Sequence, residues 1–286
     1  MDASHRLKLV AAFLALYLIW GSTYFAIRIG VESWPPFLMA GLRFVVAGSL
    51  VYAVLRWRGA PHPDRRQWVS AALLGLLMPG IGNGFVTLAQ REVSSGVAAL
   101  MVATVPLFAT LCSRLFGQRP RRLELLGVAL GMMGIAVLKS GANLQASPGG
   151  AVLLLTASAA WALGSAWSRH LPQAGGLMAS ATMMLCGGAG LLLGSALLGE
   201  RLDAVPPLSG WLVLVYLTVF GSIVAYTAYL FLLKNVSAAA ATSYAYVNPM
   251  IAVLLGVGLL GEHVGTHELA AMAIIVGAVV LIGWRR

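Results

Sequence analysis

Charged residues are scarce in this chain, and acidic residues are missing from its long apolar stretches. Charged residues account for 10% of the sequence and hydrophobic residues for 59%. Soluble proteins carry about 25% charged residues, so the composition excludes a soluble domain. All nine Asp and Glu lie between the apolar stretches or at their ends. A proton relay buried in a membrane is therefore disfavoured, because such relays place a titratable side chain near the middle of the bilayer.

Cysteines and the common catalytic motifs are also sparse or absent. Cys112 and Cys186 are the only cysteines, and each is isolated within an apolar stretch. This excludes a disulfide framework and a cysteine-rich metal site. The sequence has no glycine-rich ATP-binding loop ending in Lys and Ser or Thr, no His-Glu-x-x-His and no Gly-x-Ser-x-Gly. We therefore predict that the protein is not an enzyme and that it holds no metal and no cofactor.

The apolar stretches themselves predict an all-α membrane protein with ten transmembrane helices. A spanning helix needs roughly 20 mostly apolar residues. The first stretch follows Arg6 and Lys8, but its apolar run is too long for a signal peptide, so we expect it to stay in the mature protein. The predicted spans are 9–29, 36–55, 68–89, 95–116, 122–139, 150–169, 176–198, 210–232, 237–260 and 267–284.

The second five spans repeat the first five about 143 positions later. An odd number of spans in each copy makes the second copy enter the membrane from the opposite face. Inverted repeats of this kind surround the central site of many secondary transporters. We assign residues 1–141 to the first repeat and 142–286 to the second. Corresponding residues include Trp68 and Trp211, Val93 and Val236, Ser94 and Ser237, and Pro106 and Pro249.

The net charge of +10 comes mainly from loops on one predicted face, the face that carries both termini. Cytoplasmic loops retain the excess of Lys and Arg, so both termini are predicted to be cytoplasmic. The basic loops are expected to set this topology and to contact anionic lipids of the bilayer rather than to bind nucleic acid.

Two polar stripes occupy equivalent places in the two copies. In the third span, Asn83, Thr87 and Gln90 share one helical face because they are spaced by four and three residues. The eighth span has Ser222, Tyr226 and Tyr229 at the same spacing. We predict that Asn83 and Tyr226 face a central cavity, with Thr87, Gln90 and Ser222 as weaker candidates. Hydrogen bonding between helices, without any ligand, is the alternative.

Aromatic and proline residues suggest the rest of the cavity wall. Trp20 and Tyr24 share a face of the first span, and Trp161 takes the corresponding place in the sixth. In the ninth span, Tyr244 and Asn248 share a face beside Pro249. Pro106 matches Pro249, and breaks in such places either line a site or merely curve the helices. An aromatic cavity of this kind suits neutral, zwitterionic or cationic amphipathic solutes.

Arg43 is the one charge well inside a span. A charge at that depth costs roughly 2.5–3.5 kcal/mol on insertion scales, so the side chain should have a partner. It could hold a substrate carboxylate, extend to the membrane surface, or bind free carbonyl groups of a neighbouring helix. A structural role is favoured over substrate binding.

Closely spaced glycines allow helix backbones to approach one another. The pairs are Gly80 with Gly84 and Gly127 with Gly131. We expect them to serve internal packing, with a homodimer face as the less favoured role.

Several stretches resemble the drug/metabolite transporter superfamily, and within it the EamA-type ten-helix exporters. The run 20–28 (WGSTYFAIR), the triplet 42–44 (LRF) and the run 104–108 (TVPLF) carry the resemblance in the first copy. Asn248-Pro249 and Gly261-Glu262 carry it in the second copy. The runs 30–36 and 241–249 look like the bacterial YedA-type inner-membrane transporters in particular.

The resemblance implies a ten-helix basket in the bacterial inner membrane, with both ends cytoplasmic. It implies a cavity lined mainly by helices 1, 3, 4, 6, 8 and 9, and helices 5 and 10 that support the fold. The glutamate of the family stands only in the second copy, at Glu262, which favours a helix-end structural role for it. Carried over residue by residue, the resemblance supports these substrate-binding candidates: Trp20, Tyr24, Asn83, Trp161, Tyr226, Tyr244 and Asn248.

The predicted function is export of small organic metabolites, such as amino acids or amphipathic amines and drugs, by alternating access. Because no acidic residue lies near the middle of a span, we expect facilitated or exchange-type movement, with coupling through Glu32 or Glu92 as the alternative. A membrane receptor or scaffold without transport is the competing hypothesis. The lack of any sizeable loop for a partner to engage disfavours it.

Overall fold

The computed structural model describes residues 3–117, 121–140, 147–260, 270, 273–278 and 281, and every regular element among them is helical. Three short elements, η1 to η3, are π-helical. The first half of the chain contains α1 (Ala3–Ala15), η1 (Leu16–Trp20), α2 (Gly21–Gly30), α3 (Pro36–Trp57), α4 (Arg65–Gly75), η2 (Leu76–Asn83), α5 (Gly84–Ala89), α6 (Ser95–Val102), α7 (Val105–Leu115) and α8 (Arg122–Ser140). The second half contains α9 (Pro148–Trp167), α10 (Leu177–Leu197), α11 (Leu208–Tyr216), η3 (Leu217–Val224), α12 (Ala225–Asn235), α13 (Ala238–Ala241) and α14 (Tyr244–Leu260).

Seven helical stretches of the described chain are long and apolar enough to cross a membrane. They correspond to the predicted spans one to four and six to eight. The fifth and ninth predicted spans coincide with α8 and with α13 and α14. Most of the tenth, 267–284, lies outside the described residues, so the total of ten stays a prediction. The seven stretches are Ser4–Gly30, Pro36–Trp57, Arg65–Ala89, Ser95–Leu115, Pro148–Trp167, Leu177–Leu197 and Leu208–Asn235.

Contacts between helix ends show where the second half begins. Arg28, at the end of α2, donates to the carbonyl of Gln90 at 2.9 Å, so the first and third spans end together. Ser147, at the start of α9, donates to Glu92 in the same region at 2.8 Å. The α1 helix starts at the opposite end of the bundle, where His5 lies 6.1 Å from the Phe231 ring. The α9 helix therefore begins at the end of the bundle where α2 ends, so α9 and the first span run in opposite directions.

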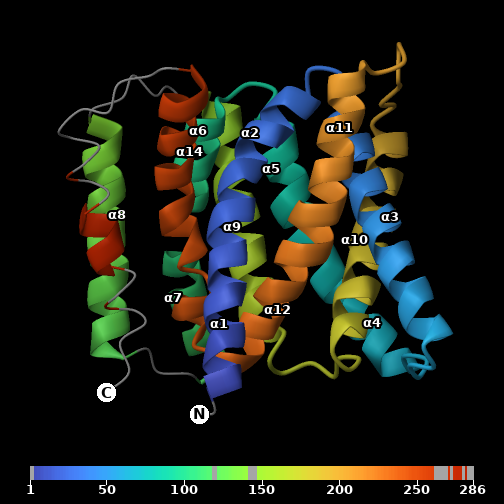
Figure 1. The fold of residues 1–286 in the computed structure, drawn as a ribbon, viewed down its shortest axis with the longest axis horizontal. Coiled ribbons are helices and arrows are strands. Elements are labelled where there is room, and N and C mark those ends of the chain that lie inside the picture. The colour runs from blue at the N-terminus through green and yellow to red at the C-terminus, as the bar shows by residue number, and fades with distance from the viewer. Residues whose placement is uncertain are drawn as a thin grey trace.

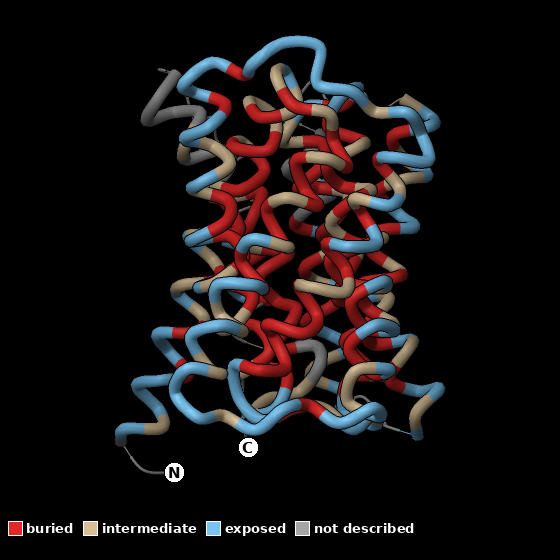
Figure 2. The backbone as a smooth tube through the Cα atoms, turned by 90° about the vertical axis from the view of Figure 1, so that its right-hand side faces the viewer, coloured by how far each residue is buried: buried red, intermediate tan, exposed pale blue. Residues whose placement is uncertain are grey.

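Burial follows the axis of the bundle. Buried residues gather along the centre, and exposed ones line the outside and the two ends (Figure 2). Large apolar side chains on the outside include Leu193 and Leu197 of α10, exposed to 61% and 78%. Exposed leucines of this kind fit a surface that meets lipid rather than water.

Two helices of different halves meet backbone to backbone at a pair of glycines. A Cβ atom added to Gly187 of α10 would lie 2.4 Å from the Gly75 carbonyl oxygen at the end of α4. No side chain fits in that space, so the contact depends on glycine. Two glycines of the closely spaced pairs Gly80–Gly84 and Gly127–Gly131 also contact other helices. Gly84 packs against Leu191, and Gly131 of α8 packs against the Tyr246 ring. Both glycines thus serve packing inside the molecule. Figure 1 shows α8 at one edge of the bundle.

The first, third and eighth spans each contain a wider, π-helical turn, and the fourth span is interrupted. The segments η2 and η3 lie at nearly corresponding places of the two halves, and η2 contains Pro79. The fourth span breaks at Ala103–Thr104, directly before Pro106. The matching Pro249 instead lies inside α14, and the break of the ninth span comes earlier, between α13 and α14. The matched prolines therefore do not make matched breaks.

Candidate functional site

A small cavity of about 50 Å³ lies among helices of both halves. That volume has room for roughly three to five water molecules. The first and third spans form one wall, and the fourth, sixth and ninth spans complete it. The lining residues are Trp20, Thr23, Tyr24, Ile27, Gly82, Asn83, Val86, Val102, Val105, Ala157, Ser158, Trp161 and Tyr244.

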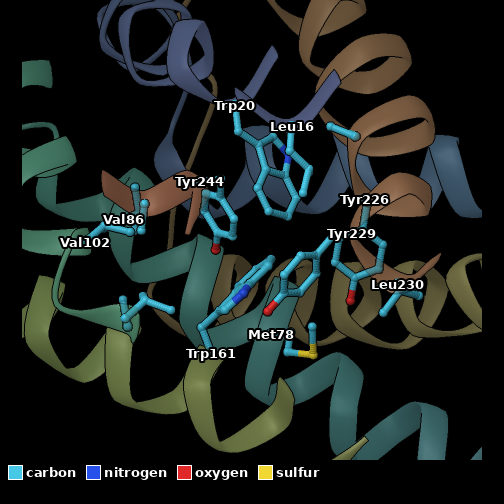
Figure 3. Packing of buried hydrophobic residues seen from close by; sticks show 14 of the residues in the cluster. Leu16, Trp20, Met78, Val86, Val102, Trp161, Tyr226, Tyr229, Leu230 and Tyr244 are labelled. Carbon is cyan, nitrogen blue, oxygen red and sulfur yellow. The ribbon is translucent and has the colours of Figure 1, made fainter. Parts of the chain in front are cut away.

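Four aromatic rings pack together at the cavity (Figure 3), and Trp20, Trp161 and Tyr244 of this aromatic cluster line it. Trp20 is the centre of the cluster: the ring centroids lie 4.6 Å from Tyr244, 5.2 Å from Tyr229 and 5.4 Å from Trp161. Tyr229 is also 5.5 Å from Trp161 and 5.6 Å from Tyr244. Most of these pairs are tilted or edge-to-face, the arrangement that aromatic rings prefer. The cluster joins helices of both halves across the middle of the bundle.

Hydrogen bonds fix two of these rings. The indole nitrogen of Trp20 donates to the carbonyl of Gly221 in η3 at 3.0 Å. The hydroxyl of Tyr229 bonds that of Ser165 at 2.6 Å, and Ser165 donates to the carbonyl of Trp161 at 2.6 Å. Buried rings whose polar atoms are bonded in this way keep a defined orientation.

Arg43 lies beside the aromatic cluster, behind the lining residue Asn83. This side chain from α3 is only 2% exposed, and its Nε donates to the hydroxyl of Ser222 at 2.6 Å. Its Nη1 donates to the Oδ1 of Asn83, a lining residue, at 3.4 Å. The guanidinium also lies 4.7 Å from the centre of the Phe44 ring. Arg43 is therefore held inside the bundle and does not extend to the membrane surface.

The structure brings five of the seven substrate-binding candidates to the cavity. Trp20, Tyr24, Asn83, Trp161 and Tyr244 all line it. Their location agrees with the prediction, but their role in binding stays a prediction.

The two remaining candidates lie just behind the lining. Tyr226 packs 6.1 Å from the Trp161 ring, and its hydroxyl donates to the Met183 sulfur at 3.7 Å. Asn248 is fully buried. Its amide interacts with the Tyr24 hydroxyl but makes no hydrogen bond of normal geometry.

The weaker candidates do not line the cavity either. Arg43 and Ser222 bond each other behind the lining residue Asn83, as described above. Thr87 is buried and donates to the carbonyl of Asn83 at 2.9 Å, which is a local bond within its own helix. Gln90 is fully buried at the end of α5, and no described residue bonds its side-chain amide.

Three hydroxyl-bearing residues of the site were not among the sequence candidates. Thr23 and Ser158 line the cavity, and Tyr229 completes the aromatic cluster. Tyr229 belongs to the stripe with Ser222 and Tyr226, which was its one signal in the sequence. Thr23 and Ser158 gave none, because small hydroxyl residues are common throughout apolar helices.

A second, larger hollow of about 530 Å³ lies at the end of the bundle where α2 ends and α3 begins. It is lined by charged residues of both signs, including Glu32, Arg91 and Glu200. Glu200 accepts hydrogen bonds from the backbone nitrogens of Phe37 at 3.2 Å and Leu38 at 2.9 Å. Its carboxylate therefore caps the start of α3.

The chain matches the EamA-like transporter family twice, over residues 7–140 and 148–284. It is 53% identical over 277 residues to the uncharacterised inner membrane transporter YedA of Escherichia coli K12, covering 96% of this chain and 90% of the relative. The uncharacterised transporter YdfC of Bacillus subtilis is 26% identical, covering 93% of this chain and 85% of the relative. A crystal structure with 23% identity has the same fold, with a TM-score of 0.78 over 96% of this chain and 98% of that one.

These matches confirm the family resemblance seen in the sequence. They make the protein a multi-pass transporter of the inner membrane. They also confirm that it is not an enzyme, since its relatives are transporters.

Proposed function

We propose, since this chain belongs to the EamA-like transporter family, that it exports small organic metabolites by alternating access through the central cavity. Amino acids and amphipathic amines are the substrates that the sequence suggested. The observation that carries the proposal is the cavity itself, which lies between the two halves and is walled by Trp20, Trp161 and Tyr244. Rocking of one half against the other would open such a site to either side in turn.

The direction of the helices supports an inverted repeat. The α9 helix starts at the opposite end of the bundle from α1, as the contacts of Ser147 with Glu92 and of His5 with Phe231 indicate. The proposal also includes ten spans and two cytoplasmic termini. The orientation of the termini follows from the excess of basic residues in the loops on the N-terminal side.

The small volume of the cavity means that the substrate must widen it. Space for roughly three to five waters is less than most amino acids need. We therefore assign the structure to a closed or nearly closed conformation, in which the aromatic cluster fills much of the path. Binding would separate the rings of Trp20, Trp161 and Tyr244, and the helices that carry them would move.

The test is solute flux into proteoliposomes that contain only the purified protein. Tyr244→Ala and Asn83→Ala should each lower the initial rate about tenfold or more, because each removes a cavity wall group. Tyr52→Ala is the matched control, since Tyr52 lies at the far end of α3 and contacts Trp68 and His62. Its rate should stay within about twofold of the wild type.

Unchanged rates in both cavity variants would remove the site assignment. Absence of flux for every solute offered to the wild-type protein would contradict transport and favour a receptor or scaffold. Accessibility labelling of a single cysteine at each terminus tests the orientation, and termini on different sides of the bilayer would overturn it.

A further inference from the structure

The buried guanidinium of Arg43 has no acidic partner among the residues that the structure describes. Its two hydrogen bonds go to Ser222 and Asn83, which are both neutral. The guanidinium group has five N–H donors, and these bonds use two of them. Neither of these two bonds uses Nη2. A buried cation held only by neutral groups is a strong attractor for an anion.

Arg43 lies directly behind the polar wall of the cavity. Asn83 and Thr23 both line the cavity. A Cβ atom added to Gly221 would lie 2.9 Å from Nη2 of Arg43 and 3.1 Å from Cγ2 of Thr23. The guanidinium therefore lies next to the cavity beside Asn83 and Thr23. It occupies space that a side chain at position 221 would fill.

The two bonds of the guanidinium differ in strength. The 2.6 Å bond to Ser222 is short, and it anchors Nε to η3. The 3.4 Å bond to Asn83 is longer than the 2.7–3.2 Å that is usual for N–H···O hydrogen bonds. A carboxylate forms charge-assisted bonds of roughly 2.7–2.9 Å and can take two N–H groups at once. It would therefore displace Asn83 with a net gain.

We infer that Arg43 is the specificity-determining residue of the cavity, and that the substrate carries a carboxylate bound by its guanidinium. The aromatic cluster then surrounds the apolar body of the substrate. An amine without a carboxylate is disfavoured, because the guanidinium repels it and no acidic side chain lines the cavity. This narrows the substrate class of the proposed function to small apolar acids and zwitterions and removes simple amphipathic amines.

The inference rests on the proposed function for its biological meaning, but a binding measurement can test it without any measurement of transport. Three probes share one branched apolar body: 4-methylpentanoate has only the carboxylate, leucine has both groups, and isopentylamine has only the amine. The rise of the melting temperature with probe concentration gives an apparent affinity for purified protein in detergent. We expect the two carboxylates to stabilise the wild-type protein and the amine to leave it unchanged.

Replacement of Arg43 sharpens the test. Arg43→Gln should weaken apparent carboxylate affinity about 10- to 100-fold, as expected for one lost charged hydrogen-bonding group. Arg43→Lys keeps the charge and should lose less. Arg114→Gln removes an exposed charge at the end of α7 and is the matched control, with unchanged affinity.

Equal or stronger stabilisation by isopentylamine would overturn the inference, as would carboxylate affinity that survives in Arg43→Gln. Absence of stabilisation by all three probes would also contradict it. The ranking of the probes on the wild-type protein decides the matter even if Arg43→Gln fails to fold. A wild-type protein that binds carboxylates but moves no solute would contradict the proposed function and leave this inference standing.

Discussion

The third and eighth spans occupy equivalent places in the two halves, yet they contribute different chemistry. Both contain a π-helical segment, η2 and η3. The first contains Pro79 and ends at Asn83, which lines the cavity. The η3 segment has no proline. Its Ser222 accepts a hydrogen bond from Arg43 of the first half, and its Gly221 leaves space for the Arg43 guanidinium. The duplication preserved the shape of the backbone while the side chains diverged.

This difference makes the site asymmetric although the fold is repeated. The first half supplies the cation, and the second half supplies the hydroxyl and the space that keep it buried. The π-helix is often found at functional sites, because its extra residue redirects the side chains beyond it. Three sets of substitutions compare the halves further.

The largest effect is expected where the halves touch backbone to backbone. Gly187→Val would place side-chain atoms against the Gly75 carbonyl, which cannot yield, and should lower the free energy of unfolding by about 3 kcal/mol or more. Gly190→Val is the control on the same helix, since a Cβ atom there meets nothing within 4 Å. Unfolding in mixed detergents measures both variants. Equal losses would mean that the glycine contact does not limit packing.

A smaller effect should separate the two corresponding tryptophans of the aromatic cluster. Trp20→Phe removes the donor to the Gly221 carbonyl, whereas the indole nitrogen of Trp161 interacts with the Tyr229 hydroxyl but makes no hydrogen bond of normal geometry. Loss of a buried hydrogen bond costs about 1 kcal/mol, so Trp20→Phe should be more destabilising than Trp161→Phe by about that amount. Melting temperatures of the two variants in the same detergent measure the difference. The reverse order would show that ring packing outweighs the bond.

The smallest effect concerns a feature that the halves share. Ser94 accepts a hydrogen bond from the Val97 nitrogen at 3.3 Å, and the corresponding Ser237 accepts one from the Ala240 nitrogen at 3.2 Å. Each begins a helix as its N-cap, so Ser94→Ala and Ser237→Ala should each cost about 1 kcal/mol. Ser94→Thr retains the hydroxyl and is the control. Clearly unequal costs in the same unfolding assay would mean that the two caps are not equivalent.

Helix positions and the faces of helices could be predicted from the sequence. Hydropathy placed the fourth span at 95–116, and the structure has α6 and α7 over Ser95–Leu115. The spacing of Ser94 and Ser237 reflected the same cap in both halves. Periodicity placed Ser222, Tyr226 and Tyr229 on one helix face, and all three are buried. It predicted that Tyr226 faces the cavity, whereas Tyr226 packs behind the lining against Trp161.

The remaining features depend on contacts between residues far apart in the chain. Arg43 meets Ser222 across 179 positions and Trp20 meets Gly221 across 201. No local pattern encodes such pairs, because each helix face has several possible neighbours. The π-helical segments were also missed, whereas Pro106 indicated the break that comes just before it at Ala103–Thr104. Of the three π-helical segments only η2 contains a proline, so we attribute them to how the helices pack rather than to the apolar pattern.

The wide turn of η3 is a point at which one end of the eighth span can rotate relative to the other. An α-helix advances by about 100° for each residue, and a π turn holds one residue more than an α turn. If that extra residue were taken up, the part of the span beyond it would swing by about that angle. Gly221 and Ser222, which lie within η3, would then shift relative to the guanidinium, and the tyrosines of α12 that follow η3 would face another neighbour. One backbone adjustment of a single residue would thus change the polarity and the shape of the passage together.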